Sequence, residues 1–447
     1  EWDRWLLMGL IGTAVGLLGF LTHQIIDSLI KLKWDLMENY LQVSKRNGQD
    51  GNIHMTWLCA LGSGLAIVVL SSGSVLFFCP AGSPAGLPEI IGYLNGTCIH
   101  HLFNIKTFLG TFVSCVLAVA SGLFCAPEGP MIHLGALLGC GLSQLQLDTL
   151  GIHLPIFTRF RNSADKRSFI TAGAGAEIAL VFRAPIGGLL FTLEEVSSFW
   201  DIRLDWQTFF CCLMATFTVD LLSSSLYGFV YRGHFGFFEA EKRIIFWNLL
   251  DINVLAFIPT ILLRMLGGLL GALFVFLNIK INKLRMQFFN SIPKSSLKKT
   301  SKLLETVLIL RILFMFCVSP YHFLRVAAAA LLVENGKQGI TYLFKRGTHE
   351  EFGYPSPCTA LAFYFILSCW MVGSAVASGL DIPMLYTGAL YGRIIGLILV
   401  SVFGVQTNEY GAWIDPGLSA AIGAASFVSG MSRLTISLTV IMVSMLS

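Results

Sequence analysis

One acidic residue, Glu128, stands inside apolar sequence, between Pro127 and Gly129. A carboxyl group at membrane depth is costly unless it has a function or a partner. At the start of a helix, unpaired backbone N–H groups stabilise its ionised form, in the place that a small anion would otherwise take. Because protonation would release this side chain, one residue could serve as both gate and proton carrier. The alternative is an acid that only caps a helix near water.

Glu128 belongs to one of three clusters of Gly and Pro that interrupt apolar runs, at residues 83–89, 126–130 and 378–383. In each cluster a proline lies at or next to the start of the next helix, where its missing N–H costs least. The N–H groups of the first turn then face the break. Several such helix ends converging at mid-membrane would bind an anion without a full positive charge. The alternative is three ordinary interhelical turns.

The elements that must position these clusters are membrane helices. The chain has 447 residues, of which 55% are hydrophobic and 13% charged, whereas a soluble domain carries about 25% charged residues. Several apolar segments are shorter than the ~20 residues that cross a bilayer, and others are long enough for two helices. This irregularity favours tilted and broken helices over a bundle of upright spans.

Basic residues gather between Leu277 and Leu303, a segment without acidic residues. They are Lys280, Lys283, Arg285, Lys294, Lys298, Lys299 and Lys302. The pattern is typical of a cytoplasmic loop, and the flanking apolar spans argue against a nucleic-acid surface. We therefore predict a first transmembrane half at 1–276, a basic cytoplasmic linker at 277–303 and a second half at 304–447. Break clusters occur in both halves, which fits inverted repeats, although no simple sequence repeat is visible.

At the three clusters the chain resembles the CLC family of chloride channels and transporters, whose signatures are GSGIPE, GKEGP or GREGP, and GxFxP. The matching segments here are Pro84–Glu89, Ala126–Pro130 and Gly379–Pro383. The likeness continues, in the family's order, through 92–96, 165–167, 184–188, 193–195, 422–425 and 433–442. It is nearest to the late-endosomal and lysosomal branch.

The resemblance implies an all-α membrane protein with the CLC-type fold, in which two inverted-topology halves hold many tilted and broken helices. It implies that Glu128 is the gating and proton glutamate. Glu195 would be the inner proton glutamate, because exchangers carry a glutamate there and channels usually an apolar residue. For its neighbour Glu194, the point where a helix leaves the membrane is an equal alternative. The anion contacts would fall on Ala85, Gly86, Gly129, Leu380, Asp381 and Ile382.

The expected function is voltage-influenced anion transport, as anion/proton antiport. A passive chloride channel and a transport-impaired scaffold subunit are the alternatives. Ala85 replaces a serine whose hydroxyl donates to the anion, and losing such a bond costs about 1.5–3 kcal/mol. Asp381 replaces phenylalanine and would repel chloride when ionised. Ala126-Pro127 replaces Gly-Lys or Gly-Arg. The sequence ends at Ser447, before the family's last helix and its CBS domains.

Two further residues, Glu177 and Arg183, stand where the family prefers small side chains, and their spacing of six does not make them an i,i+4 pair. We expect no cofactor and no metal site, because the adjacent His100 and His101 lack further ligands at metal spacing. No enzyme motif is found. The expected partners are a second copy in a homodimer, chloride, protons and the lipid bilayer of an intracellular membrane. An accessory membrane subunit stays open, and no nucleic acid is expected.

Overall fold

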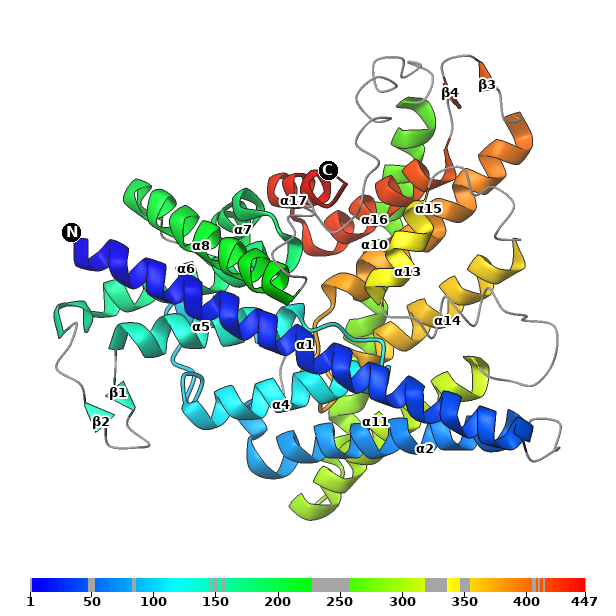
Figure 1. The fold of residues 1–447 in the computed structure, drawn as a ribbon, viewed down its shortest axis with the longest axis horizontal. Helices are drawn as coiled ribbons and strands as arrows, with labels where there is room; N and C mark the ends of the chain where they lie inside the picture. Colours follow the sequence, from blue (N-terminus) through cyan, green and yellow to red (C-terminus); the bar gives the residue numbers. More distant parts are fainter. Residues whose placement is uncertain are drawn as a thin grey trace.

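Helices make up nearly all of the computed structural model (Figure 1). It describes residues 2–46, 53–82, 86–144, 146–147, 152–153, 158–198, 200–226, 257–317, 336–345, 354–403, 407–408, 411–412 and 415–446. The described strands form two antiparallel hairpins of two-residue strands, β1 (Gln146–Leu147) with β2 (Ile152–His153) and β3 (Thr407–Asn408) with β4 (Gly411–Ala412). The predicted all-α class is confirmed.

The N-terminal helices pack around one long helix, α1, which lies along α8, α6 and α4 (Figure 1). A proline is the second residue of α3 and the first residue of α7, positions at which a missing N–H costs least. The elements are α1 (Trp2–Arg46), α2 (Ile53–Gly73), the π-helical η1 (Ser74–Phe78), η2 (Pro80–Gly82), α3 (Leu87–Leu94), α4 (Ile105–Ser121), α5 (Glu128–Gln144), η3 (Thr158–Phe160), α6 (Ser163–Phe182), α7 (Pro185–Phe191), the π-helical η4 (Thr192–Val196) and α8 (Ile202–Leu226).

The C-terminal helices form a second body centred on α16, which packs against both α15 and α10. Contacts of α17 with α7 and of α11 with α2 join the two bodies. The elements are α10 (Phe257–Asn290), α11 (Ser295–Cys317), α13 (Gly336–Phe344), α14 (Pro355–Met371), α15 (Asp381–Phe403), α16 (Pro416–Ser432) and α17 (Ile436–Leu446).

The basic segment 277–303 is mostly helical rather than a loop, because α10 runs on to Asn290 and α11 begins at Ser295. The predicted division between 276 and 277 therefore falls inside α10. Arg285 fixes this region: its Nε lies 2.9 Å from Glu305 Oε1, and its guanidinium also donates to the carbonyl oxygens of Trp370 and Val372. The ion pair thus joins α10 to α11, and the two backbone bonds tie α10 to the end of α14.

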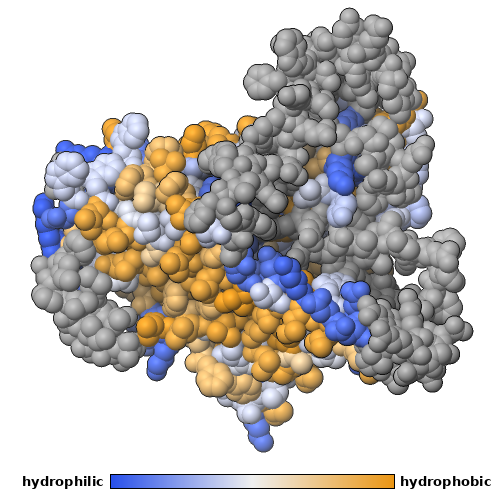
Figure 2. Space-filling model, in the orientation of Figure 1, coloured by the Kyte–Doolittle hydropathy of each residue, from blue (hydrophilic) through white to orange (hydrophobic). Residues whose placement is uncertain are grey.

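The outer surface is that of a membrane protein. By length and composition, five of the described helices could cross a bilayer: Trp2–Asn39, Leu58–Phe78, Ile202–Ser225, Phe257–Asn290 and Asp381–Val402. Their outward side chains are large and apolar, as on α10, where Leu269 is 68% exposed. Figure 2 shows apolar side chains over much of the described surface on this face. Such a surface is stable against lipid and not against water.

Two helix pairs cross so closely that a Cβ atom would not fit between them. A Cβ on Gly135 of α5 would lie 2.5 Å from the carbonyl oxygen of Gly173 on α6, and one on Gly139 would lie 2.2 Å from that of Phe169. The crossing of α15 and α16 repeats this contact, with a Cβ on Gly423 at 2.5 Å from the carbonyl oxygen of Gly388. Small residues allow such backbone approach in membrane proteins.

These two crossings belong to a structural repeat, residues 126–191 (the first repeat) and 379–446 (the second repeat). Each begins with an acid at the first helical residue and a proline two positions later, Glu128 with Pro130 and Asp381 with Pro383. In each, the second helix ends at an arginine in the left-handed region, Arg183 at φ 50° or Arg433 at φ 62°. A short helix, α7 or α17, follows. The repeat explains why small residues suit position 183, since glycine adopts this conformation without strain.

Candidate functional site

Glu128 is the first residue of α5 and is only 1% exposed. The rest of its cluster, from Ala126 to Pro130, is also buried. The carboxyl group therefore lies inside the protein, at the helix end whose N–H groups and dipole favour negative charge. The alternative of a capping acid near water does not fit this burial.

The second cluster lies directly against the first. Ala126 and Gly379 form an isolated antiparallel bridge and exchange two backbone hydrogen bonds. The nitrogen of Ala126 lies 3.3 Å from the carbonyl oxygen of Gly379, and the nitrogen of Gly379 lies 2.7 Å from the carbonyl oxygen of Ala126. A Cβ on Gly379 would lie 2.6 Å from the backbone nitrogen of Gly129. Only glycine fits at this contact, so the start of α5 and the segment before α15 are locked together.

The bridge also relates the two helix starts to each other. Glu128 lies two residues after Ala126, and Asp381 lies two residues after Gly379. An antiparallel pair that exchanges both bonds has local two-fold symmetry, so α5 and α15 begin on opposite sides of one bridge. The predicted convergence of these two clusters is observed.

The third cluster reaches α5 one turn further along. Gly86, which precedes α3, has φ +86° and packs on His133, because a Cβ built on Gly86 would lie 2.4 Å from the Cβ of His133. Its position at the turn before α3 thus requires glycine twice, for the positive φ and for the close contact. Ala85, predicted to face the anion, lies outside the described residues.

The remaining predicted anion residues surround the start of α15. Leu380 and Asp381 are half-buried and Ile382 is buried at 6% exposure. Asp381 interacts electrostatically with Glu195, which is half-buried in the π-helical turn η4. The structure therefore brings Asp381 towards the predicted inner proton residue and, through the bridge, towards Glu128. The role of Glu195 as inner proton residue stays a prediction.

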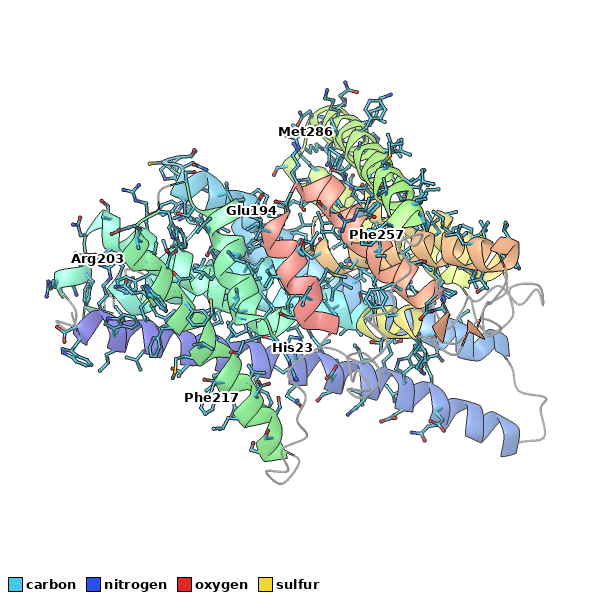
Figure 3. The ribbon with its side chains drawn as sticks, turned by 90° about the horizontal axis from the view of Figure 1, so that it is seen from above. His23, Glu194, Arg203, Phe217, Phe257 and Met286 are labelled. Atoms are coloured by element: carbon cyan, nitrogen blue, oxygen red, sulfur yellow. The ribbon has the colours of Figure 1, made fainter. Side chains whose placement is uncertain are left out.

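Glu194, to which the sequence assigned no definite role, caps a helix. Its Oε1 accepts bonds from the backbone N–H and hydroxyl of Thr435 at 2.7 and 3.0 Å, and its Oε2 accepts bonds from those of Ser437 at 3.0 and 2.7 Å. Figure 3 shows Glu194 beside the C-terminal helices. Partial burial alone would raise its pKa, but these four bonds together lower the pKa of Glu194 to about 2. It caps α17 from another part of the chain.

The neighbours of Glu128 include residues that sequence reasoning did not assign to the site. Cys115, Cys125 and Tyr364 all interact electrostatically with Glu128. The Cys115 thiol donates a bond of 3.9 Å to the carbonyl oxygen of Pro127. Cys115 comes from α4, and Tyr364 comes from α14, far along the sequence. No spacing signal could have joined them, because their helices meet only in the folded chain.

No group of three or more His, Cys, Asp and Glu side chains that could hold a metal occurs among the described residues. His101 has φ 62° in the turn before α4, and His100 precedes it. The site is therefore composed of carboxyl groups, thiols and helix N-termini, a set that suits small anions and protons.

Residues 64–447 match the family model described as "Voltage gated chloride channel". The chain is 32% identical to chloride channel protein D of Dictyostelium discoideum, over 98% of this chain and 51% of that protein. It is 31% identical to the H(+)/Cl(−) exchange transporter 7 of Mus musculus, over 99% of this chain and 56% of the relative. The chain thus spans little more than half the length of these relatives.

Two solved structures share the fold. One is the crystal structure of a slow cyanobacterial Cl⁻/H⁺ antiporter, with a TM-score of 0.74 at 19% identity, covering 99% of this chain and 89% of the other. The second is the crystal structure of a eukaryotic CLC transporter, with a TM-score of 0.69 at 19% identity, covering 99% and 70%. The predicted arrangement of broken membrane helices agrees with both.

Proposed function

The chain belongs to the voltage gated chloride channel family, and from this premise we propose that it exchanges a small anion for protons across a membrane. Chloride is the proposed anion, in keeping with the names of its relatives. No cofactor takes part, since anion and proton are themselves the substrates. The membrane is proposed to be that of an intracellular compartment, and the functional unit a homodimer with one pathway per copy.

One observation carries the proposal: the Ala126–Gly379 bridge joins the starts of α5 and α15 at the buried carboxyl of Glu128. An anion at these helix ends would accept bonds from first-turn N–H groups. The ionised Glu128 side chain competes for the same N–H groups, whereas the protonated side chain does not. Each cycle then exchanges an anion for a proton held on Glu128, and Glu195 supplies protons from the cytoplasmic side.

Reconstitution into liposomes tests the exchange. With a chloride gradient and no proton gradient, the wild-type chain is expected to drive protons against the chloride flow. Glu128→Ala removes the proton carrier and the competitor together, so chloride should still move and proton movement should be lost. Chloride flux without protons in the wild type would instead identify a passive channel.

A transport-impaired scaffold is favoured by one specific observation, the carboxyl group of Asp381 in the first turn of α15. A negative charge there opposes anion entry. Reverting Asp381→Phe and Ala85→Ser together should raise chloride flux if the pathway is merely weakened. No flux in either form of the chain would support the scaffold, with an accessory membrane subunit as its natural partner.

A further inference from the structure

A second carboxyl group is sealed inside the first repeat. Glu177 lies on α6 with 0% exposure, and neither of its side-chain oxygens has a hydrogen-bond partner among the described residues. An ionised carboxylate in such a place is strongly disfavoured, because it loses its water and gains no counter-charge. These surroundings therefore favour the protonated form of Glu177.

The position of Glu177 links it to the proposed gate. Its Cβ packs on Gly135, whose own built Cβ would lie 3.0 Å away. Gly135 follows Glu128 by seven residues, which is two helical turns or about 10 Å along the same face of α5. Both carboxyl groups therefore lie on the seam between α5 and α6.

A thiol from a third helix interacts with both carboxyl groups. Cys115 on α4 interacts electrostatically with both Glu177 and Glu128 and bonds to the carbonyl oxygen of Pro127. On other sides of α6, Thr192 of η4 and Thr208 of α8 pack on Gly175, and Leu180 packs on Gly19 of α1. Cys115 is thus a titratable neighbour of Glu177.

The second repeat shows that packing does not require a carboxyl group at this position. Phe427 occupies the corresponding place on α16, six residues before the closing arginine, and is also 0% exposed. Its Cβ lies 3.0 Å from a Cβ built on Gly388, the counterpart of Gly135. An apolar side chain fills this niche without an unsatisfied polar group, so Glu177 carries a cost that packing alone does not explain.

We propose that Glu177 is a third proton-holding residue of the exchange pathway, beside Glu128 and Glu195, and that it passes its proton to Glu128 along the seam between α5 and α6. This inference rests on the proposed anion/proton exchange. In the transfer, the O–H bond of Glu177 breaks as an O–H bond forms on the Glu128 carboxylate, and a proton that enters by way of Glu195 later restores Glu177. The thiol of Cys115 interacts electrostatically with both groups, and no redox step is involved.

Paired substitutions separate this role from simple packing. Glu177→Gln keeps the volume and loses the exchangeable proton, so chloride-driven proton movement should be lost while chloride flux persists. Glu177→Asp keeps the carboxyl group on a shorter side chain and should retain proton movement. A packing role predicts the opposite order, because Gln matches the volume of Glu and Asp does not. Wild-type coupling in Glu177→Gln would overturn the proposal.

A control variant and an independent measurement separate loss of the proton from loss of structure. Thr171→Val removes a buried hydroxyl of the same helix, one bonded to the carbonyl oxygen of Arg167, and should leave coupling unchanged. Infrared difference spectroscopy detects the protonated carboxyl group independently of transport: its C=O stretching band should be present in the wild type and absent from Glu177→Gln. A band of equal intensity in that variant would also overturn the proposal. If Glu128→Ala leaves proton coupling intact, the proposed function itself fails.

Discussion

The first and second repeats have the same backbone plan but carry different side chains at its central positions. Each starts at the Ala126–Gly379 bridge with an acid in the first turn, crosses its next helix on glycines and closes on a left-handed arginine. Yet Glu128 is buried, whereas Asp381 is half-buried and interacts electrostatically with Glu195.

The same contrast extends along the two seams, where Glu177 of the first repeat corresponds to Phe427 of the second. The first repeat therefore concentrates buried carboxyl groups, whereas the second has an apolar seam, with partly exposed acids at the starts of its helices, Asp381 and Asp415. The two repeats thus have the same backbone but different carboxyl chemistry. The surroundings of each carboxyl group decide whether it is buried and favours its protonated form or remains accessible to water.

The contact between the repeats should be the most sensitive point. In Gly379→Ala the new Cβ would meet the backbone nitrogen of Gly129 at 2.6 Å, a backbone atom that cannot move aside cheaply. We expect a loss of about 3 kcal/mol or more in the free energy of unfolding, seen as a lower melting temperature in detergent. Gly141→Ala is the control, since a Cβ there meets open space; equal melting of the two variants would contradict the bridge.

A smaller effect is expected from making the second helix start apolar. Asp381→Phe removes a negative charge beside the proposed anion path, worth at least about 1.4 kcal/mol, so apparent chloride affinity should rise about tenfold. The KM for chloride in liposome flux checks this. Asp381→Asn separates charge from size and should give most of the gain. An unchanged KM in both variants would place Asp381 away from the anion.

The start of α17 offers a third case, in which the acid comes from another segment. Glu194→Gln should cost about 1 kcal/mol of stability at neutral pH, as loss of a cap does. The pKa of Glu194 lies near 2, below the ordinary 4.5, so its ionised form contributes stability above pH 4.5 that is lost as pH falls towards 2. Melting curves across this range should show a steeper acid loss in the wild type than in Glu194→Gln. Parallel curves would rule out the cap.

The smallest effect concerns the two closing arginines. Glycine is relaxed at positive φ, so Arg433→Gly should stabilise the protein by about 0.5–1 kcal/mol. Arg183→Gly should gain less, because Arg183 also pairs with Asp220 at 3.8 Å, a contact worth about 0–1 kcal/mol. Melting temperatures of the two variants provide the comparison. A larger gain at position 183 would show that its ion pair contributes nothing.

Sequence patterns predicted much of this site. Burial of a carboxyl group at Glu128 and the meeting of two Gly/Pro clusters followed from residue types and helix-start rules. The helical linker could not be predicted, because a run of lysines is compatible with a loop and with a helix. The cap made by Glu194 could not be predicted either, because a capping residue from a distant segment produces no spacing pattern near the helix that it caps. Cys115 and Tyr364 were missed for the same reason.

The sequence by itself determined the membrane helices, their breaks and the acids that stand at those breaks, because hydropathy and proline chemistry act locally. Only the tertiary structure decided that Ala126 meets Gly379, that Glu177 shares a seam with Glu128 and that Phe427 is its counterpart. These relations depend on backbones that approach through glycines far apart in the chain, and no local rule sets which glycine faces which helix.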